Sequence, residues 1–98
     1  MQFLVIAYDG TDEKAPERRM AAREAHLAGI QKMAAEGKAL YGTAILDERE
    51  RMIGSMLVVE YPSRADVDAW LKSEPYVVGD VWRKIEVYPA RVAPMFAK

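Results

Sequence analysis

The sequence predicts an α+β protein with its elements in the order β-α-β-β-α-β, and three features support this prediction. Apolar runs of strand length are bounded by turn residues. Two segments with apolar residues at helical spacing separate these runs. The two middle runs are joined directly by a short charged connection. This order is typical of ferredoxin-like folds, in which a four-stranded antiparallel sheet carries both helices on one face.

The first half of the chain holds a strand, a long helix and a second strand. Residues 3–8 are apolar and end at Asp9-Gly10, a strong turn signal. The helix is expected over residues 16–36, with a proline in its first turn and Gly37 as the residue that ends it. Its apolar residues recur at helical spacing, as Met20, Leu27, Ile30 and Met33. Residues 38–46 form the expected second strand.

Two further strands are expected in the second half. Residues 52–61 form the third, after the exposed charged connection 47–51. Residues 81–88 form the fourth, which Pro89 ends or places at a sheet edge. The C-terminal piece that follows looks extended and could cover a sheet edge.

A short second helix lies between these strands. Ser63 and Asp66 form an N-terminal capping signature. The apolar positions that follow are Val67, Trp70 and Leu71. Pro75 limits the helix because it disfavours helical geometry at the preceding residue, and it can open one further turn that Gly79 closes.

The strands are apolar on both faces, which predicts a partner for the sheet. In the first strand, Phe3 and Val5 point one way while Leu4 and Ile6 point the other. Two helices on one face cannot cover both sides. The sequence therefore predicts a homodimer joined sheet to sheet, and the alternative is one helix on each face of the sheet.

Composition limits the classes of function. With 98 residues, 51% of them apolar, the chain is expected to be one domain over residues 1–98. A net charge of −1 argues against a nucleic-acid partner, and no apolar run is long enough for a membrane span. The absence of cysteine excludes disulfides, thiolate metal sites and a cysteine nucleophile. Without a basic leader, the expected location is the cytoplasm.

The most informative residues lie on the long helix. Arg19, Arg23 and His26 fall at i, i+4 and i+7 and therefore share one stripe. Ala22, Ile30 and Met33 lie on the same stripe, so this side is also expected to be buried. Ionisable groups on a buried stripe carry a desolvation cost unless partners or a wet pocket receive them. This conflict predicts a functional site.

Each of these side chains has a functional and a structural interpretation. His26 can transfer protons near neutral pH, or it can be a helix histidine bonded to a carbonyl or to water. Arg23 can bind a carboxylate or phenolate in bidentate fashion, and Arg19 can bind the same ligand. Alternatively, both arginines are surface residues whose stems cover apolar neighbours.

Two other residues are candidates for the same site. Glu74 precedes Pro75 at a helix start, which favours a charged carboxylate that could orient His26. Alternatively, Glu74 only caps the turn. Ser55 follows Gly54 in an apolar strand, where a small polar pair marks the close approach of a ligand or backbone, or a bulge. No phosphate-binding glycine loop and no metal-ligand spacing is present, so neither cofactor nor metal is expected.

Together these motifs resemble the YciI-related family over nearly the whole chain. Residues 23–27 match its R-x-x-H-L helix motif, and Glu36-Gly37 precedes the second strand. Gly54-Ser55 enters the third strand. Glu74-Pro75-Tyr76 stands where the family usually has Asp-Pro-Tyr or Asp-Pro-Phe. The resemblance implies a dimeric ferredoxin-like fold with a His–carboxylate pair in a cleft.

The chain departs from the family pattern at two points. The usual aspartate is Glu74 here, one methylene longer. The later glycine of the motif appears as Gly79-Asp80, which makes Asp80 a second candidate for the carboxylate that pairs with His26.

The resulting hypothesis is a cofactor-independent enzyme that acts on a small anionic or phenolic molecule. Its chemistry would be proton transfer or elimination, of lyase, dehydrochlorinase or hydrolase type, since one branch of the family includes a dehydrochlorinase that needs no cofactor. His26 and Glu74 would be catalytic, and Arg23, Arg19 and Ser55 would bind the substrate. The alternative is a non-catalytic dimeric module that binds a metabolite or a protein.

Overall fold

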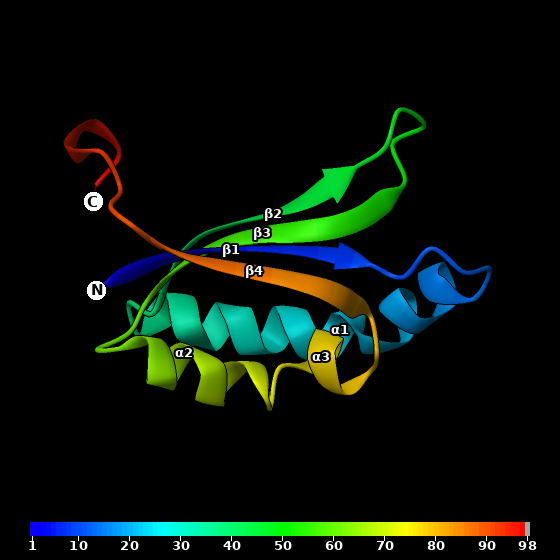
Figure 1. Ribbon diagram of the computed structural model, residues 1–98, viewed down its shortest axis with the longest axis horizontal. Coiled ribbons are helices and arrows are strands. Elements are labelled where there is room, and N and C mark those ends of the chain that lie inside the picture. Colours follow the sequence, from blue (N-terminus) through cyan, green and yellow to red (C-terminus); the bar gives the residue numbers. More distant parts are fainter. Residues whose placement is uncertain (98) are drawn as a thin grey trace.

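The computed structural model describes residues 1–97, so Lys98, the last residue of the expected domain, lies outside the described residues. The four strands form one antiparallel sheet in the order β2-β3-β1-β4, and the helices cover one face of it (Figure 1). This arrangement is the predicted ferredoxin-like architecture. In chain order the elements are β1 (Gln2–Asp9), α1 (Ala15–Ala35), β2 (Ala39–Leu46), β3 (Met52–Glu60), α2 (Arg64–Leu71), α3 (Pro75–Val78), β4 (Trp82–Ala90) and the 3-10 helix η1 (Pro94–Phe96).

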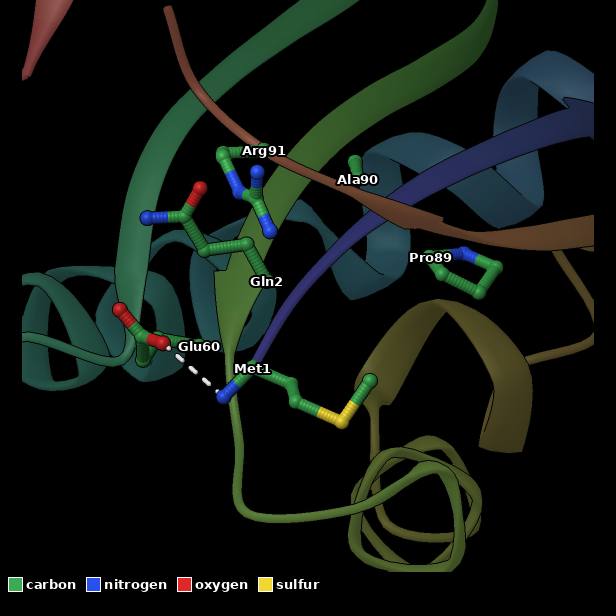
Figure 2. A pocket seen from close by; sticks show the side chains of 6 residues that line it. All are labelled: Met1, Gln2, Glu60, Pro89, Ala90 and Arg91. Carbon is green, nitrogen blue, oxygen red and sulfur yellow. Dashed lines mark ion pairs between the residues drawn. The ribbon is translucent and has the colours of Figure 1, made fainter. Parts of the chain in front are cut away.

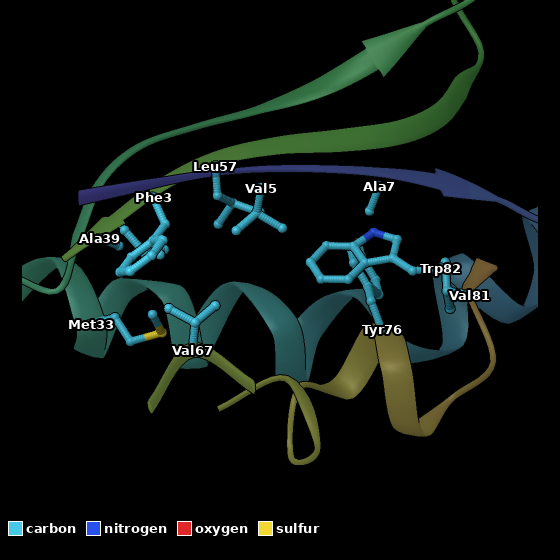
Figure 3. Close-up of a cluster of buried hydrophobic side chains, with 11 residues drawn as sticks. Phe3, Val5, Ala7, Met33, Ala39, Leu57, Val67, Tyr76, Val81 and Trp82 are labelled. Carbon is cyan, nitrogen blue, oxygen red and sulfur yellow. The ribbon is translucent and has the colours of Figure 1, made fainter. Parts of the chain in front are cut away.

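The core lies between the sheet and the helices (Figure 3). One face of β1 contributes Phe3, Val5 and Ala7, and β3 contributes Leu57 and Val59. These side chains are buried against residues from the three helices and the start of β4, namely Met33, Val67, Tyr76, Val81 and Trp82. Burying each large apolar side chain of this set contributes about 1.5–3 kcal/mol.

The long helix α1 buries a narrower stripe than its apolar pattern suggests. Arg19, His26 and Met33, each seven residues apart, are buried. Met20 and Leu27 are 59% and 46% exposed. Their helical spacing with the other apolar residues therefore did not mean that they are buried. Each stands one residue, or about 100°, beyond a member of the buried stripe and therefore lies on the flank of α1.

Local capping explains how α2 and α3 are separated. The Ser63 hydroxyl accepts from the backbone N–H of Asp66 at 3.3 Å, as the capping signature predicts. Glu74 has an extended backbone, as expected before a proline, and its carboxylate accepts from the backbone N–H of Tyr76 at 3.1 Å. The turn that Pro75 opens therefore begins with a carboxylate held on its first free N–H.

The other face of the sheet carries apolar residues that no helix covers. Four side chains at its centre are half-buried: Leu4, Ile6, Met56 and Val58. The C-terminal segment turns back over one end of this sheet face (Figure 1). The backbone N–H of Val92 donates to the Gln2 side chain at 2.6 Å, and the Tyr41 hydroxyl donates to the Phe96 carbonyl at 2.5 Å. The segment was expected to be extended; Pro94–Phe96 instead form η1, while Ala93 and Ala97 on either side are extended.

Candidate functional site

Two elements bring a histidine and a carboxylate together in the interior. His26 comes from the buried stripe of α1, and Glu74 from the residue that caps α3. His26 Nδ1 lies 2.5 Å from Glu74 Oε1, and the two side chains are 9% and 2% exposed. The same Oε1 accepts from the backbone N–H of Tyr76, so one oxygen serves both the cap and the imidazole.

Two aromatic rings fix the plane of the imidazole. Tyr76 stacks on His26 with ring centroids 3.9 Å apart and an interplanar angle of 14°. Trp82 contacts the same ring edge-on at 5.7 Å and 76°. A carboxylate only accepts hydrogen bonds, so the hydrogen of the His26–Glu74 bond lies on Nδ1, and Nε2 keeps a lone pair when the ring is neutral. Within residues 1–97 no protein group is bonded to Nε2.

Arg19 forms the second polar cluster of the site. Its Nη1 donates to both carboxylate oxygens of Asp9 at 2.9 Å, and its Nη2 donates to Ser55 Oγ at 3.1 Å. The guanidinium also lies 4.7 Å from the centroid of the Tyr76 ring. Since Arg19 is 4% exposed, Asp9 balances its charge inside the protein. Arg19 therefore already has protein partners for both of its terminal nitrogens.

Ser55 joins this cluster to the aromatic residues. Its Oγ also accepts from Trp82 Nε1 at 3.1 Å. At the neighbouring Gly54, a Cβ would lie 2.5 Å from the carbonyl oxygen of Ala7, so β1 and β3 come too close there for any side chain. The small pair Gly54-Ser55 thus marks a point where two backbone segments approach closely. This is one of the alternatives given for the pair in the sequence analysis.

A cleft of about 260 Å³ lies between α1 and strands β2 and β3, and His26, Arg19, Ser55 and Tyr76 contribute to its lining. Small residues of β2, Gly42, Thr43 and Ala44, form one wall. The remaining lining is Arg19, Arg23, His26, Leu27, Ile30, Met52, Ser55, Leu57 and Tyr76. The volume is just below the usual range for drug-sized ligands, which favours a small molecule.

Arg23 and Tyr76 set the charge of this cleft. Arg23 is exposed, and no carboxylate of residues 1–97 forms an ion pair with it. Burial raises the pKa of the Tyr76 hydroxyl, while the positive charges of Arg19 and Arg23 oppose that rise. Tyr76 therefore stays neutral at physiological pH, and Arg23 is a cation available to a ligand.

Asp80, the other candidate for the carboxylate beside His26, lies in a different cluster. Arg83 donates to both of its oxygens at 2.9 and 2.7 Å, and this contact lowers the pKa of Asp80. The Arg18 side chain donates to the backbone carbonyl of Asp80 at 2.9 Å. Glu74, and not Asp80, is the carboxylate that contacts the imidazole.

Sequence reasoning missed two members of the site. Asp9 was interpreted only as a turn residue, although a carboxylate at the end of a strand ten residues before a buried arginine was a usable signal. Trp82 was not among the candidate site residues, although its indole N–H bonds to Ser55. Asp9 ends the first strand and Trp82 begins the fourth, and no local pattern connects them to Arg19 and Ser55.

A second hollow lies at the other end of β1, around Met1 (Figure 2). It has a volume of about 550 Å³, and the Met1 amino group pairs with Glu60 across it at 3.1 Å. Its lining holds neither a buried acid–base pair nor a stacked aromatic. Over the described part of the chain, no group of three or more metal-binding side chains occurs, and no helix has the length and apolarity to cross a membrane.

Comparison with known proteins agrees with the fold. Protein YciI of Escherichia coli O6:H1 is 30% identical over 95 residues, which cover 91% of this chain and 95% of that protein. The solved structure of 5-chloro-2-hydroxyhydroquinone dehydrochlorinase from Burkholderia phenoliruptrix AC1100, in complex with 2,5-dihydroxybenzoquinone, has a TM-score of 0.81 at 22% identity, covering 97% of this chain and 98% of that one. A dimeric ferredoxin-like protein of unknown function from Jannaschia sp. CCS1 has a TM-score of 0.52 at 16% identity, covering 93% and 98%. The model of the YCII-related domain matches residues 1–91. The chain therefore belongs to the YCII-related domain family.

Proposed function

We propose that this protein catalyses proton transfer or elimination on a small anionic or phenolic molecule, without a cofactor. The observation that carries the proposal is the His26–Glu74 pair, whose atoms Nδ1 and Oε1 lie 2.5 Å apart; His26 lines the cleft and the Tyr76 ring stacks on it. A general base needs an orienting partner on one nitrogen and a free nitrogen toward the substrate. The contact of Nδ1 with Glu74, and the absence of a bond to Nε2 among residues 1–97, support this role for His26.

The chemical step follows from these groups. His26 Nε2 takes a proton from a C–H or O–H group of the substrate, and the electrons of that bond form a new double bond as an anionic leaving group departs. Glu74 stabilises the imidazolium that results, because its charged oxygen accepts from Nδ1. Arg23 at the cleft binds the negative charge of the substrate. Loss of a proton and a halide balances without an oxidant or reductant, and the similarly folded dehydrochlorinase supports this reaction type.

The proposal includes a homodimer formed through the uncovered face of the sheet. Leu4, Ile6, Met56 and Val58 give that face an apolar centre. An apolar sheet face of this kind is typical of an interface between subunits. The dimeric ferredoxin-like protein of similar fold supports a second copy of this chain as the occupant.

The test combines ligand binding with turnover. A panel of small aromatic acids, halogenated hydroxyphenols and 2,5-dihydroxybenzoquinone is screened by thermal shift, and stabilising halogenated compounds are assayed for halide release. We expect His26→Asn to abolish turnover, because its amide keeps a donor near Glu74 but cannot carry a proton back and forth. Turnover that persists in His26→Asn contradicts the proposal. Binding without turnover in either protein favours the non-catalytic metabolite-binding module.

A further inference from the structure

The Ser55 hydroxyl is held by two groups that can only donate. Arg19 Nη2 and Trp82 Nε1 each lie 3.1 Å from its oxygen. Guanidinium and indole nitrogens have no acceptor capacity, and a serine hydroxyl has one hydrogen and two lone pairs. Both lone pairs are therefore engaged, and the hydroxyl can take part in further bonding only as a donor.

In the described part of the chain, the hydrogen of this hydroxyl has no protein acceptor. Across residues 1–97 neither a carbonyl nor a carboxylate oxygen accepts from Ser55. Ser55 is 2% exposed, and it lines the cleft beside His26. A buried donor without an acceptor costs about 1–3 kcal/mol, so a ligand oxygen placed there gains a hydrogen bond that the protein itself does not supply.

We infer that Ser55 is a dedicated hydrogen-bond donor for an oxygen of the ligand, and that Arg19 and Trp82 are positioning residues that restrict it to this role. This inference rests on the proposed function, because it concerns the same cleft. The ligand class is a small ring compound with a phenolate, enolate or carbonyl oxygen over Ser55. A ligand that presents an N–H or ammonium group at this point has no acceptor to bind.

The charges around Ser55 favour an anionic oxygen. Arg19 is already balanced by Asp9, yet its buried Nε–H has no acceptor, so the cluster has more donors than acceptors. Arg23 adds a positive charge at the same cleft without an ion-pair partner among residues 1–97. The donation from the Arg19 cation also polarises the Ser55 hydroxyl and strengthens its own bond to a ligand.

The same geometry argues against Ser55 as a nucleophile. A serine attacks through a lone pair, and both lone pairs of Ser55 point at N–H groups. The hydroxyl also forms no hydrogen bond with His26, which would have to take its hydrogen. Ser55 therefore acts on charge that develops at a ligand oxygen and forms no covalent bond.

Two coloured probes of the same size test this inference. 4-Nitrophenolate presents an acceptor oxygen, and 4-nitroaniline presents N–H donors in its place; binding of both is measured above the pKa of 4-nitrophenol. We expect the wild-type protein to prefer the phenolate by about 10- to 100-fold, the range that one hydrogen bond to a charged group gives. Ser55→Ala should remove this preference and leave 4-nitroaniline affinity unchanged.

Three further variants keep the result interpretable. Trp82→Phe retains the hydroxyl but frees one of its lone pairs, so the preference should shrink even if Ser55→Ala fails to fold. Thr43→Val removes a hydroxyl from the opposite wall and should keep the preference. His26→Asn should also keep it while losing turnover, which separates this inference from the proposed reaction.

Three outcomes overturn the inference. The wild-type protein binds neither probe, it binds 4-nitroaniline as tightly as the phenolate, or folded Ser55→Ala and Trp82→Phe both keep the full preference.

Discussion

The carboxylate of Glu74 caps the helical turn that carries Tyr76, and the ring of Tyr76 stacks on the imidazole that the same carboxylate holds. The two residues thus fix His26 from two directions, one by a hydrogen bond at 2.5 Å and one by ring contact at 3.9 Å. A helix cap and a candidate catalytic partner are the same atom. Structural and chemical roles of Glu74 can be separated only by variants that change charge and length independently.

Charge and length at Glu74 can be changed one at a time. Glu74→Gln keeps the length and the cap oxygen but loses the negative charge, so turnover should fall by about 10- to 100-fold, the worth of a hydrogen bond to a charged group. Glu74→Asp keeps the charge and is also a good cap, so it should retain more activity than Glu74→Gln. Steady-state rates and thermal midpoints measured together check this order. Equal activity of Glu74→Gln and wild type would show that the charge is unnecessary.

Two glycines of the sheet should respond differently to a methyl group. Gly54→Ala places a Cβ 2.5 Å from a backbone oxygen of β1, so we expect a loss of about 1–3 kcal/mol or more in the free energy of unfolding. Gly42→Ala meets only the Leu57 side chain, at 3.8 Å, and should cost little. Denaturant unfolding of both variants provides the comparison. Similar stabilities would contradict the close approach of β1 and β3.

Stability in acid should depend on the exposed cluster of Asp12, Arg18, Asp80 and Arg83. The hydrogen bond from Arg18 lowers the pKa of Asp12, and that from Arg83 lowers the pKa of Asp80. A carboxyl group whose pKa is lowered by folding stabilises the protein above its ordinary pKa, and this contribution is lost as the pH falls through the lowered value.

The window for this effect lies below about pH 4. Asp12→Asn should therefore show a smaller loss of thermal midpoint than wild type between neutral pH and about pH 3. Because Asp12, Asp80 and Arg83 are exposed and Arg18 is partly so, added salt should reduce the difference. An identical acid response in the variant would show that the ion pair makes no contribution.

A charge in the centre of the uncovered sheet face should prevent the proposed dimer. Met56 pairs with Ile6 in the sheet and is half-buried without a partner subunit. Met56→Glu would place a carboxylate in an apolar interface, so sedimentation should show a monomer where the wild type is a dimer. Ala69→Glu, on the exposed side of α2, is the matched control and should not change the mass. A wild-type monomer at micromolar concentration would contradict the proposed dimer.

Much of the fold follows from local patterns. The Ser63 cap, the proline at Pro75 and the turn after β1 predict where elements begin and end, because each depends on neighbours along the chain. The His26–Glu74 contact was one of the alternatives that the sequence left open, beside a Glu74 that only caps the turn and a pairing with Asp80, and the structure decides between them. Which residues of α1 are buried was harder to predict, because Met20 and Leu27 fit the same apolar spacing as the residues that face the core.

The contacts of Asp9 and Trp82 could not be predicted for a different reason. They depend on the register of β1 and β4, which shifts between Tyr8 and Asp9. A shift of one residue changes the face on which every later side chain lies. Only the assembled sheet decides that Trp82 reaches Ser55 and that Asp9 reaches Arg19.

The groups that surround the cleft come from both ends of the chain, from Asp9 in the first strand to Trp82 in the last. No fragment shorter than residues 9–82 contains them all, so a chain cut within this range would lack part of the cluster. Ligand affinity is therefore a readout of complete folding. A partly folded chain would not bind the ligand, even if its helices had formed.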